Sequence, residues 1–457
     1  MGWILDLLNK QEDLNANALT DGNQVVTYKE LINAINSYEH KLDVRSNKRV
    51  TGLVLDHSLD SLLLLMSCLD REMSLLILDD HQKSADIDLI SKKCKVDTWI
   101  VPNDYKLNDS FQSLTYTQLN LIKNKGEKEE EFSSEHKGYL YQATSGTTGE
   151  MKVAKISYSA IQKGGEKYAK WFRWSNKDII LSTVPLHHSY GLIGALIGTI
   201  AASSYFILCN KPSPRVVTEF IKRFKCTVLI GVPLLYDLMA QSNLINDQDI
   251  RTLRMSVSSG GKLAESTIDQ FEKKFTVNIF QVYGSTETGA IAATSPFEST
   301  PRGAVGMILP GVIVTTDKET KQLIVKSDTL FSGYVLSVHS TDISHYMSDL
   351  GEVEEDIIYL SGRRSNSINV SGRKIDPHEI KEVLLKHPKI TDAKVFGVED
   401  DLYGQKIKAV VLLQEDISSE EVKEFTRKSL ASYKVPHLIE KWEGKSLTWK
   451  TNIVIDL

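Results

Sequence analysis

Residues 141–152 read Tyr-Gln-Ala-Thr-Ser-Gly-Thr-Thr-Gly-Glu-Met-Lys. Small residues fill the stretch ahead of Lys152, and they are Thr144, Ser145, Gly146, Thr147, Thr148 and Gly149. Hydroxyls and glycines in a row suit neither a core helix nor a strand. They suit a loop that offers backbone N–H groups, hydroxyls and one ammonium to a polyphosphate, because glycine lets the backbone approach a ligand closely. A polar surface turn explains the loop equally well when it is considered alone.

The composition of the chain is that of an ordinary globular protein. Of its 457 residues, 41% are hydrophobic and 25% are charged, which predicts either one large domain or several ordinary ones. The net charge of −5 provides no basic excess, so a nucleic-acid partner is disfavoured. The four cysteines are scattered and form no CxxC pair, which favours reduced thiols and a cytoplasmic protein.

Two stretches bear on membrane association. Residues 1–6, Met-Gly-Trp-Ile-Leu-Asp, lack the basic start of a secretory signal. Residues 190–208 carry no charge and nearly match the length of a membrane span. The break at residues 202–204, followed by the β-prone residues 205–208, instead predicts a buried helix that leads into a buried strand. We therefore expect no transmembrane segment.

Short apolar runs alternate with helical patterns along much of the chain. Strands are expected at residues 50–55, 75–78, 138–142, 179–184, 228–230, 255–258 and 278–283, with early helices at 27–42 and 59–69. This alternation predicts a parallel α/β sheet, in which ligands bind beyond the carboxyl ends of the strands. The polar run at residues 124–137 is expected to be a solvated connector.

The expected pattern of secondary structure changes in the second half of the chain. From about Arg302, turn signals such as Pro310-Gly311 and Ser332-Gly333 separate short strands and predict a small β subdomain. Beyond Gly362, strands at 395–398 and 407–413 and helices at 375–387 and 420–430 predict a separate module. The expected fold class is α/β. A large N-terminal domain of mixed α/β sheets spans residues 1–363, and a small mobile C-terminal α+β domain spans residues 364–457.

Three familiar motifs are absent from the sequence. The nearest candidate for a P-loop, Gly444-Lys445-Ser446, has Ile439 where the first glycine of that motif belongs. Residues 378–382, His-Glu-Ile-Lys-Glu, end in glutamate where a zinc helix has its second histidine. The adjacent His187 and His188 cannot share one helix face. No metal cage of protein ligands is evident from these patterns.

Four further segments have the residue types of a nucleotide site. Gln281-Val-Tyr-Gly-Ser-Thr-Glu287 follows an expected strand and supplies an aromatic ring, two hydroxyls and a carboxylate. Here Tyr283 could stack on a base, Thr286 could contact a phosphate and Glu287 could hold Mg²⁺. The other segments are Ser258-Ser-Gly-Gly261, Asp349-Leu-Gly351 and Gly362-Arg363. Taken one at a time, strand-end turns and surface ion pairs explain them as well.

The order of these segments carries more information than any one of them. Along the chain come the residue 144–152 loop, Pro185-Leu-His-His188 with Gly191, Ser259-Gly-Gly261, Tyr283-Gly-Ser-Thr-Glu287, Asp349-Leu-Gly351, Gly362-Arg363 and Asn369-Val-Ser-Gly372-Arg-Lys-Ile375 followed by Pro377-His-Glu-Ile380. Over roughly residues 25–440 the chain resembles the adenylate-forming (ANL) superfamily, which includes acyl-CoA synthetases, amino-acid adenylation domains and luciferases. This resemblance implies activation of a carboxylate by ATP to an acyl-adenylate, followed by transfer of the acyl group to a thiol.

The resemblance also implies a role for each matched residue. Residues 144–149 and Lys152 would cradle the β- and γ-phosphates, Thr286 would contact the α-phosphate, and Glu287 would bind Mg²⁺. The adenine would lie between Tyr283-Gly284 and Gly260-Gly261. Asp349, assisted by Arg363, would take the ribose hydroxyls. His188 would lie beside the carboxylate, and the loop 370–372, including Gly372, would line the thiol tunnel after the small domain rotates at Ser365.

The chain departs from the family pattern at several positions. Met151 and Val153 flank Lys152 where Pro and Gly are usual, Met347-Ser348 replaces a Thr-Gly, and Ser365 replaces the usual Asp or Lys hinge. The family's C-terminal catalytic lysine aligns with Val454. Lys450, or Lys445, could replace it only with a shift in the alignment. Adenylation is therefore expected to be weak, to use Lys450, or to be absent.

The acid and the acceptor follow from the same comparison. No acidic residue occurs between Ile179 and Leu208, so a substrate ammonium there would have no partner. This favours an acyl-CoA synthetase of fatty-acid metabolism, an acid–thiol ligase that uses ATP, Mg²⁺ and CoA. A pocket lined by Ile193, Leu196 and Ile197 is the expected acyl site. The alternatives are a ligase that loads an acyl carrier protein and an ATP-binding pseudo-enzyme.

Overall fold

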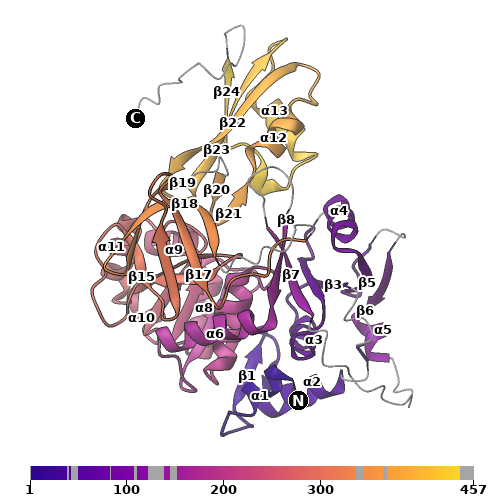
Figure 1. The fold of residues 1–457 in the computed structure, drawn as a ribbon, viewed down its shortest axis with the longest axis vertical. Helices are drawn as coiled ribbons and strands as arrows, with labels where there is room; N and C mark the ends of the chain where they lie inside the picture. Colours follow the sequence, from indigo (N-terminus) through magenta and orange to yellow (C-terminus); the bar gives the residue numbers. More distant parts are fainter. Residues whose placement is uncertain are drawn as a thin grey trace.

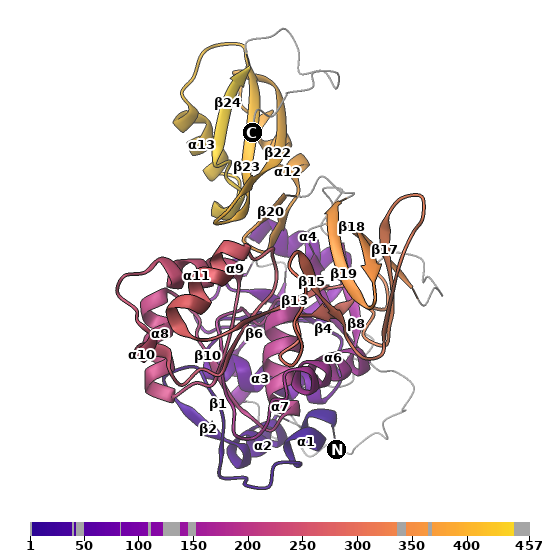
Figure 2. The ribbon, with the colours of Figure 1, turned by 90° about the vertical axis from the view of Figure 1, so that its left-hand side faces the viewer.

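The computed structural model describes residues 2–38, 41–42, 50–82, 84–107, 111–121, 138–144, 152–335, 344–363 and 368–442. The described chain forms a large body with a smaller lobe above it, which is built from residues near the C-terminus (Figure 1). A second view, turned by 90°, shows the same division (Figure 2). This arrangement confirms the expected fold class. The lobe boundary at residue 363 stays a prediction, because residues 364–367 lie outside the described part.

The first sheet of the large body has the strand order β6-β5-β3-β4-β7-β8 within the described residues. Its pairs are parallel except for the β7–β8 hairpin. Its strands are β3 (Val50–Leu55), β4 (Leu75–Asp79), β5 (Val96–Val101), β6 (Gln112–Thr115), β7 (Tyr139–Thr144) and β8 (Lys152–Ser157). The predicted strands at 50–55, 75–78 and 138–142 are therefore confirmed to within two residues.

The second sheet holds thirteen of the described strands, and one half of it is parallel. The parallel strands lie in the order β1-β10-β9-β11-β12-β13. They are β1 (Asn17–Thr20), β10 (Tyr205–Leu208), β9 (Ile179–Ser182), β11 (Val228–Gly231), β12 (Met255–Ser258) and β13 (Ile279–Ser285), with β2 (Val25–Thr27) antiparallel at the edge. The predicted strands 179–184, 228–230, 255–258 and 278–283 all lie here.

The other half of this sheet is antiparallel and corresponds to the expected β subdomain. Its strands are β14 (Gly289–Ala293), β15 (Ala304–Ile308), β16 (Val312–Thr316), β17 (Gln322–Ser327), β18 (His345–Glu354) and β19 (Ile357–Arg363). Strand β13 pairs with both β12 and β14, so the subdomain strands continue the parallel sheet. The sequence did not predict this continuity, because the spacing of apolar residues and the turn residues do not indicate which strands pair.

Alternation along the strands distributes side chains between separate cores. Leu53 and Leu55 of β3 pack in the main core between the sheets, whereas Val50 and Val54 pack on the opposite face.

The helices of the large body are α1 (Trp3–Leu8), α2 (Tyr28–Ser37), α3 (Leu59–Asp70), α4 (Ser84–Cys94), α5 (Tyr116–Leu121), α6 (Tyr158–Trp171), α7 (Gly198–Ala201), α8 (Pro214–Phe224), α9 (Pro233–Gln241), α10 (Asp247–Ile250) and α11 (Glu265–Phe275).

Hydroxyl caps set the starts of four of these helices, including α8, which Ser213 caps. Thr27 caps α2 in a capping box with Glu30, Ser58 caps α3, and Ser157 caps α6. Helix α2 ends at Ser37, five residues before the predicted end at Leu42. The prediction ran too far because the helical spacing of apolar residues continues into the turn that follows the helix. The predicted helix 59–69 is confirmed as α3.

The uncharged stretch at 190–208 is buried, as predicted. It forms a π-helix, η2 (Tyr190–Ile197), then α7, a break at residues 202–204 and strand β10. Gly165 of α6 allows η2 to pack closely, because a Cβ there would lie 2.5 Å from Ile197 Cγ2. Among the helices of the described residues, none combines the length and the apolar character that a membrane crossing needs.

The C-terminal lobe has its own sheet and its own core. Its strands are β20 (Ile368–Val370), β21 (Arg373–Ile375), β22 (Ile390–Asp400), β23 (Gly404–Leu413) and β24 (Leu438–Trp442), and its helices are α12 (Pro377–Leu384), α13 (Ser419–Arg427) and the 3-10 turn η3 (Ser432–Lys434). Its apolar residues cluster with one another. The connector at 124–137, Ser365 and Lys450 fall outside the described residues, so their predicted roles stay predictions.

A buried carboxylate fastens the amino ends of the central parallel strands. Asp178, 5% exposed, accepts hydrogen bonds from Arg254 Nε (2.7 Å) and Nη2 (3.0 Å) and from Thr227 Oγ1 (2.9 Å). These residues immediately precede β9, β12 and β11. Burial raises the pKa of Asp178, but Arg254 and the hydrogen bonds lower it more, so the net shift is below the usual value.

Replacing this carboxylate is expected to destabilise the large body. Asp178→Asn leaves the Arg254 charge without its partner and should lower the free energy of unfolding by about 3 kcal/mol. Because the pKa is lowered on folding, this contribution is complete above pH 3.8, the unfolded value. It is lost as the pH falls through the folded pKa.

Urea unfolding at neutral and acid pH would measure this effect. The matched control is Asp269→Asn, which removes an exposed partner of Arg302 and should cost less than about 1 kcal/mol. Equal losses in the two variants would contradict the role given to Asp178.

Candidate active site

A cleft separates the large body from the C-terminal lobe, and the predicted site residues line it. Residues from both parts face it. The predicted residues that line it are Thr144, Lys152, His188, Gly260, Gly261, Tyr283, Gly284, Thr286, Glu287, Asp349 and Gly372. Most of those from the large body lie at the carboxyl ends of the parallel strands or just beyond them, as open α/β sheets require of a ligand site. Segments more than 200 residues apart along the chain therefore meet in one place.

The β7–β8 hairpin holds the ends of the Gly-rich segment. Thr144 ends β7, Lys152 begins β8, and the two residues pair directly across the hairpin. The Thr144 hydroxyl also donates a hydrogen bond to the Lys152 carbonyl (3.4 Å). Residues 145–151, which include Ser145, Gly146, Thr147, Thr148 and Gly149, lie outside the described part of the chain. The described geometry therefore places both ends of the predicted phosphate loop in the cleft.

Glu287 lies in a chain of polar contacts with Tyr334 and Lys152. The Tyr334 hydroxyl donates a 2.8 Å hydrogen bond to Glu287 Oε1, and the Lys152 ammonium lies 5.2 Å from the centre of the Tyr334 ring. Burial raises the pKa of Glu287, but the Lys374 charge and the Tyr334 hydroxyl lower it more. The carboxylate is therefore ionised at neutral pH, which is the form that binds Mg²⁺.

The turn between β13 and β14 presents Glu287 and Thr286 to the cleft. Within this turn the Ser285 N–H donates a hydrogen bond to Thr288 Oγ1 (3.0 Å), and the Glu287 N–H donates to Ser285 Oγ (3.2 Å). Serine and threonine side chains commonly stabilise turns in this way. The motif therefore fixes the direction of two predicted ligand contacts through its own hydroxyls.

Tyr283 and Asp349 lie on two different strands of the large sheet and are hydrogen bonded to each other. Tyr283 lies on β13, and its hydroxyl donates a 2.9 Å hydrogen bond to Oδ2 of Asp349, which lies on β18. Asp349 is also opposite Arg363 in the β18–β19 pairing. The contact places the residue predicted to flank adenine beside the residue predicted to hold the ribose. The Arg363 side chain lies outside the described part of the structure, so its predicted role stays a prediction.

Two backbone segments without side chains touch where the lobe meets the large body. Gly372 has φ +84° and Gly260 has φ +87°, both in the left-handed region that favours glycine. A Cβ on Gly372 would lie 2.7 Å from the Gly260 carbonyl oxygen, which is closer than real Cβ contacts allow. The β20–β21 turn of the lobe is therefore docked on the Gly260-Gly261 segment that follows β12. The predicted thiol-tunnel loop and the predicted adenine wall are in contact.

His188 projects into the cleft from the segment that follows β9. Desolvation of the ring by the surrounding protein lowers the pKa of His188 well below its usual value, and the charges of His187 and then Arg373 lower it further. The imidazole is therefore neutral at neutral pH. A neutral ring can donate or accept a hydrogen bond beside a carboxylate without adding a charge.

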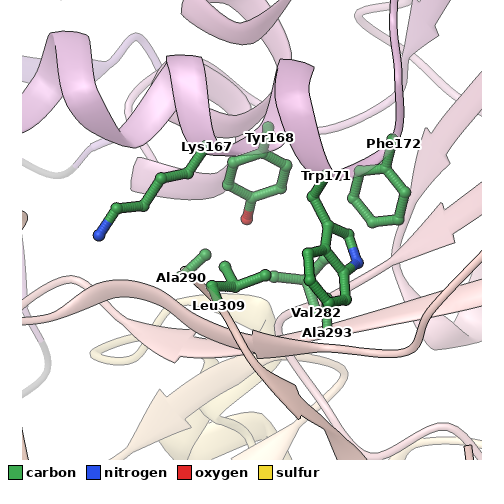
Figure 3. Close-up of a pocket in the computed structure, with 8 residues that line it drawn as sticks. All are labelled: Lys167, Tyr168, Trp171, Phe172, Val282, Ala290, Ala293 and Leu309. Atoms are coloured by element: carbon green, nitrogen blue, oxygen red, sulfur yellow. The ribbon is translucent and has the colours of Figure 1, made fainter. Parts of the chain in front are cut away.

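A small apolar pocket lies directly behind the cleft wall. It is lined by Lys167, Tyr168, Trp171, Phe172, Val282, Ala290, Ala293 and Leu309. Figure 3 shows the Tyr168 ring below α6 with its hydroxyl directed towards the strands. Tyr168, Val282 and Ala290 line the cleft as well. Of the residues expected in an acyl pocket, Ile193 reaches the cleft, whereas Leu196 and Ile197 lie in the core.

Several cleft residues were not predicted from the sequence. Tyr334 and Lys374 act on Glu287. Tyr334 belongs to none of the motifs, and Lys374 lies in the motif at residues 369–375 but was given no role there. His57, Asp79 and His187 cluster at one end of the cleft. A signal for part of this cluster was available: His57 follows β3 and Asp79 ends β4. These strands are parallel neighbours, so both residues had to lie at the same sheet edge.

Comparison with known proteins identifies the family. Residues 9–335 match the family model of AMP-binding enzymes, and residues 379–448 match the model of the AMP-binding enzyme C-terminal domain. Among solved structures, o-succinylbenzoate CoA synthetase from Bacillus subtilis superposes with a TM-score of 0.84 at 20% identity, covering 97% of this chain and 95% of that one. A malonyl-CoA ligase complex superposes with a TM-score of 0.83 at 19% identity, covering 98% and 100%. At these identities the likeness establishes the fold.

Curated relatives are similar to this chain at low identity. The oxalate–CoA ligase of Saccharomyces cerevisiae is 26% identical over 73% of this chain and 65% of its own length. The long-chain-fatty-acid–CoA ligase of Bacillus subtilis is 27% identical over 67% of this chain and 58% of its own length. The chain thus matches less than two thirds of the length of either relative. The family models span most of the chain and confirm the resemblance drawn from the motifs: the chain belongs to the AMP-binding enzymes of the adenylate-forming superfamily.

Proposed function

We propose that this protein activates a carboxylic acid with ATP, forming an acyl-adenylate and pyrophosphate, and then transfers the acyl group to CoA. The observation that carries the proposal is the meeting of the motif residues in one cleft. Tyr283 and Asp349 are hydrogen bonded there, Glu287 is ionised there, and Gly372 of the lobe closes on Gly260. Relatives named as CoA ligases support the choice of acceptor.

Charge distribution in the cleft suits attack by a carboxylate on the α-phosphorus. The charge of Lys374 acts on Glu287, and the Lys152 ammonium lies 5.2 Å from the ring of Tyr334, which donates a hydrogen bond to Glu287. Bound Mg²⁺ would neutralise phosphate charge, and the ionised Glu287 is the residue that we propose to hold it. We assign Thr286 to the α-phosphate, and residues 144–149 with Lys152 to the β- and γ-phosphates. Preorganised charges of this kind lower the barrier where negative charge develops.

We propose that the acyl group is uncharged, as in a fatty acid. The segment from Ile179 to Leu208 contains no charged side chain of either sign, and His188 is neutral. Neither a substrate ammonium nor a second carboxylate would find a charged partner there. The relatives' names include oxalate and malonate as well as long-chain fatty acids, so the choice of acid needs a direct test.

ATP–pyrophosphate exchange with a panel of acids tests both the activity and the acid. The panel would contain fatty acids of graded length, a hydroxycinnamic acid, malonate and oxalate. We expect exchange with the uncharged acyl chains and little exchange with the dicarboxylates. ATP binding without exchange for any acid would instead support an ATP-binding pseudo-enzyme. Exchange followed by loading of an acyl carrier protein, and not of CoA, would support the alternative acceptor.

A substitution at the lobe contact should separate the two half-reactions. Gly372→Ala places a Cβ against the Gly260 carbonyl and is strained at φ +84°, so the docked arrangement should form less readily. We expect acyl-CoA formation from preformed acyl-adenylate to slow by about tenfold or more. ATP–pyrophosphate exchange should change much less, because the residues assigned to ATP belong to the large body.

Gly404→Ala is the matched control for this experiment. Gly404 also lies in the lobe with φ +74°, but the nearest atom to an added Cβ is 3.7 Å away. The control therefore carries similar backbone strain without the clash. An equal slowing of both half-reactions in Gly372→Ala, or an equal effect in Gly404→Ala, would contradict the proposed role of the contact.

Removing the Tyr334 hydroxyl should weaken metal-dependent activity. Tyr334→Phe deletes the hydrogen bond to Glu287, which lowers the pKa of that carboxylate. The pKa should therefore rise, so the acid limb of the pH–rate profile should move to higher pH. The Mg²⁺ concentration for half-maximal exchange should rise by about tenfold, as for other residues that orient a metal ligand.

The matched control for Tyr334→Phe is Tyr346→Phe, which alters an exposed tyrosine that also lines the cleft. We expect its Mg²⁺ dependence to equal that of the wild type. An unchanged acid limb in Tyr334→Phe would show that the hydroxyl does not tune Glu287.

A further inference from the structure

Three side chains from three different strand ends meet at one side of the cleft. His57 follows β3, Asp79 is the last residue of β4, and His187 lies in the segment after β9. Asp79 Oδ2 is 3.6 Å from His57 Nε2 and 3.1 Å from His187 Nδ1. One ligand-type atom from each of the three residues lies within 4.8 Å of the others. The roles proposed for ATP, the acid and the thiol use none of them.

His57 is the strongest sign that something is bound here. Its side chain is 4% exposed, and within the described residues neither of its ring nitrogens makes a hydrogen bond. His187 Nδ1 is also buried without an aligned hydrogen bond, although Asp79 is close. Leaving buried polar atoms unsatisfied costs stability, so native proteins rarely do so without a ligand or another partner. Here both rings border the same carboxylate.

The backbone that carries His187 is held in place from behind. The Gln142 side-chain amide donates a 3.1 Å hydrogen bond to the His187 carbonyl, and Ser189 in turn donates to Gln142. Gln142 is fully buried on β7. Contacts of this kind fix the position of metal-ligating residues. The cluster is thus joined to both sheets of the large body.

We propose that His57, Asp79 and His187 bind a divalent transition-metal ion, with Zn²⁺ as the best match. Nitrogen and oxygen ligands lie about 2.0–2.2 Å from a tetrahedral Zn²⁺ and therefore about 3.3–3.5 Å from each other. The observed separations of 3.1 and 3.6 Å from Asp79 bracket that value. Two imidazoles and one carboxylate are borderline ligands that suit Zn²⁺, whereas Mg²⁺ prefers oxygen ligands alone.

A metal-free alternative is an ion pair between Asp79 and a protonated histidine. One protonated ring would satisfy the carboxylate. It would leave the 3.6 Å contact of His57 beyond hydrogen-bond distance. A metal ion satisfies both rings and the carboxylate at once.

The position of the site suggests what the ion does. The cluster ties β3 and β4 of the first sheet to the segment of the second sheet that carries His188, whose ring centre is 4.0 Å from that of His187. The ion would fasten this cleft wall, and its fourth coordination position would face the cleft, which all three ligands line. This inference does not depend on the proposed ligase activity, since metal binding is measured without nucleotide, acid or CoA.

Cobalt substitution tests the site directly. Full-length protein without a histidine tag would be stripped with a chelator and titrated with Co²⁺, and the visible d–d bands would be followed. We expect one Co²⁺ per chain with the intense bands of four-coordinate nitrogen and oxygen ligation, displaced by one Zn²⁺. Asp79→Asn and His57→Gln should each lower the affinity by at least about 100-fold. Circular dichroism would establish that each variant is folded.

His81→Gln is the matched control. His81 is exposed and belongs to a second group, with Asp79 and Asp80, that could also attract an ion. We expect it to bind Co²⁺ like the wild type. Loss of binding in His81→Gln would place the ion at that exposed group and overturn the proposal. Equal binding by the wild type and folded Asp79→Asn, or no stoichiometric binding by either, would also overturn it and leave the ion pair as the explanation.

Discussion

Backbone hydrogen bonding between parallel strands is the constraint on which the cleft depends. Because β9, β11, β12 and β13 pair in parallel, their carboxyl ends share one edge, where Ser258 is paired with Gln281. The segments that follow these strands therefore all begin at the cleft. The Asp178 cluster fastens the opposite, amino-terminal ends of these strands. The buried ion pair thus lies at one edge of the sheet, and the chemistry proposed here lies at the other.

The same constraint explains what the sequence could predict. Apolar runs such as those of β10 (Tyr205–Leu208) and β11 (Val228–Gly231) coincide with strands, because a strand buried on both faces is close to continuously apolar. Ordered motifs located Tyr283, Glu287 and Asp349, and the structure brings these residues together. Contacts made by side chains far apart in sequence had no such signal. Tyr334 meets Glu287 across 47 residues, and His187 meets Asp79 from a different sheet.

Prediction from the sequence also failed where the pairing of distant strands, and not the spacing of apolar residues, decides the structure. The turn-rich region after Arg302 has the local texture of an independent unit, yet β13 and β14 join it to the parallel strands. Helix α2 stops at Ser37 although the apolar spacing persists to Leu42. In both cases local spacing states which face is apolar, but long-range packing decides what that face contacts.

Strand β18 carries Asp349 opposite Arg363, the last residue of β19, and the chain reaches the C-terminal lobe directly after β19. The residue assigned to the ribose therefore pairs with the last described residue before the lobe. If the lobe adopts a second orientation, and the two orientations hold Asp349 differently, nucleotide affinity differs between them. Thermodynamic reciprocity then requires the nucleotide to shift the lobe equilibrium by the same factor. The β18–β19 strand pair would thus couple nucleotide binding in the cleft to the orientation of the lobe.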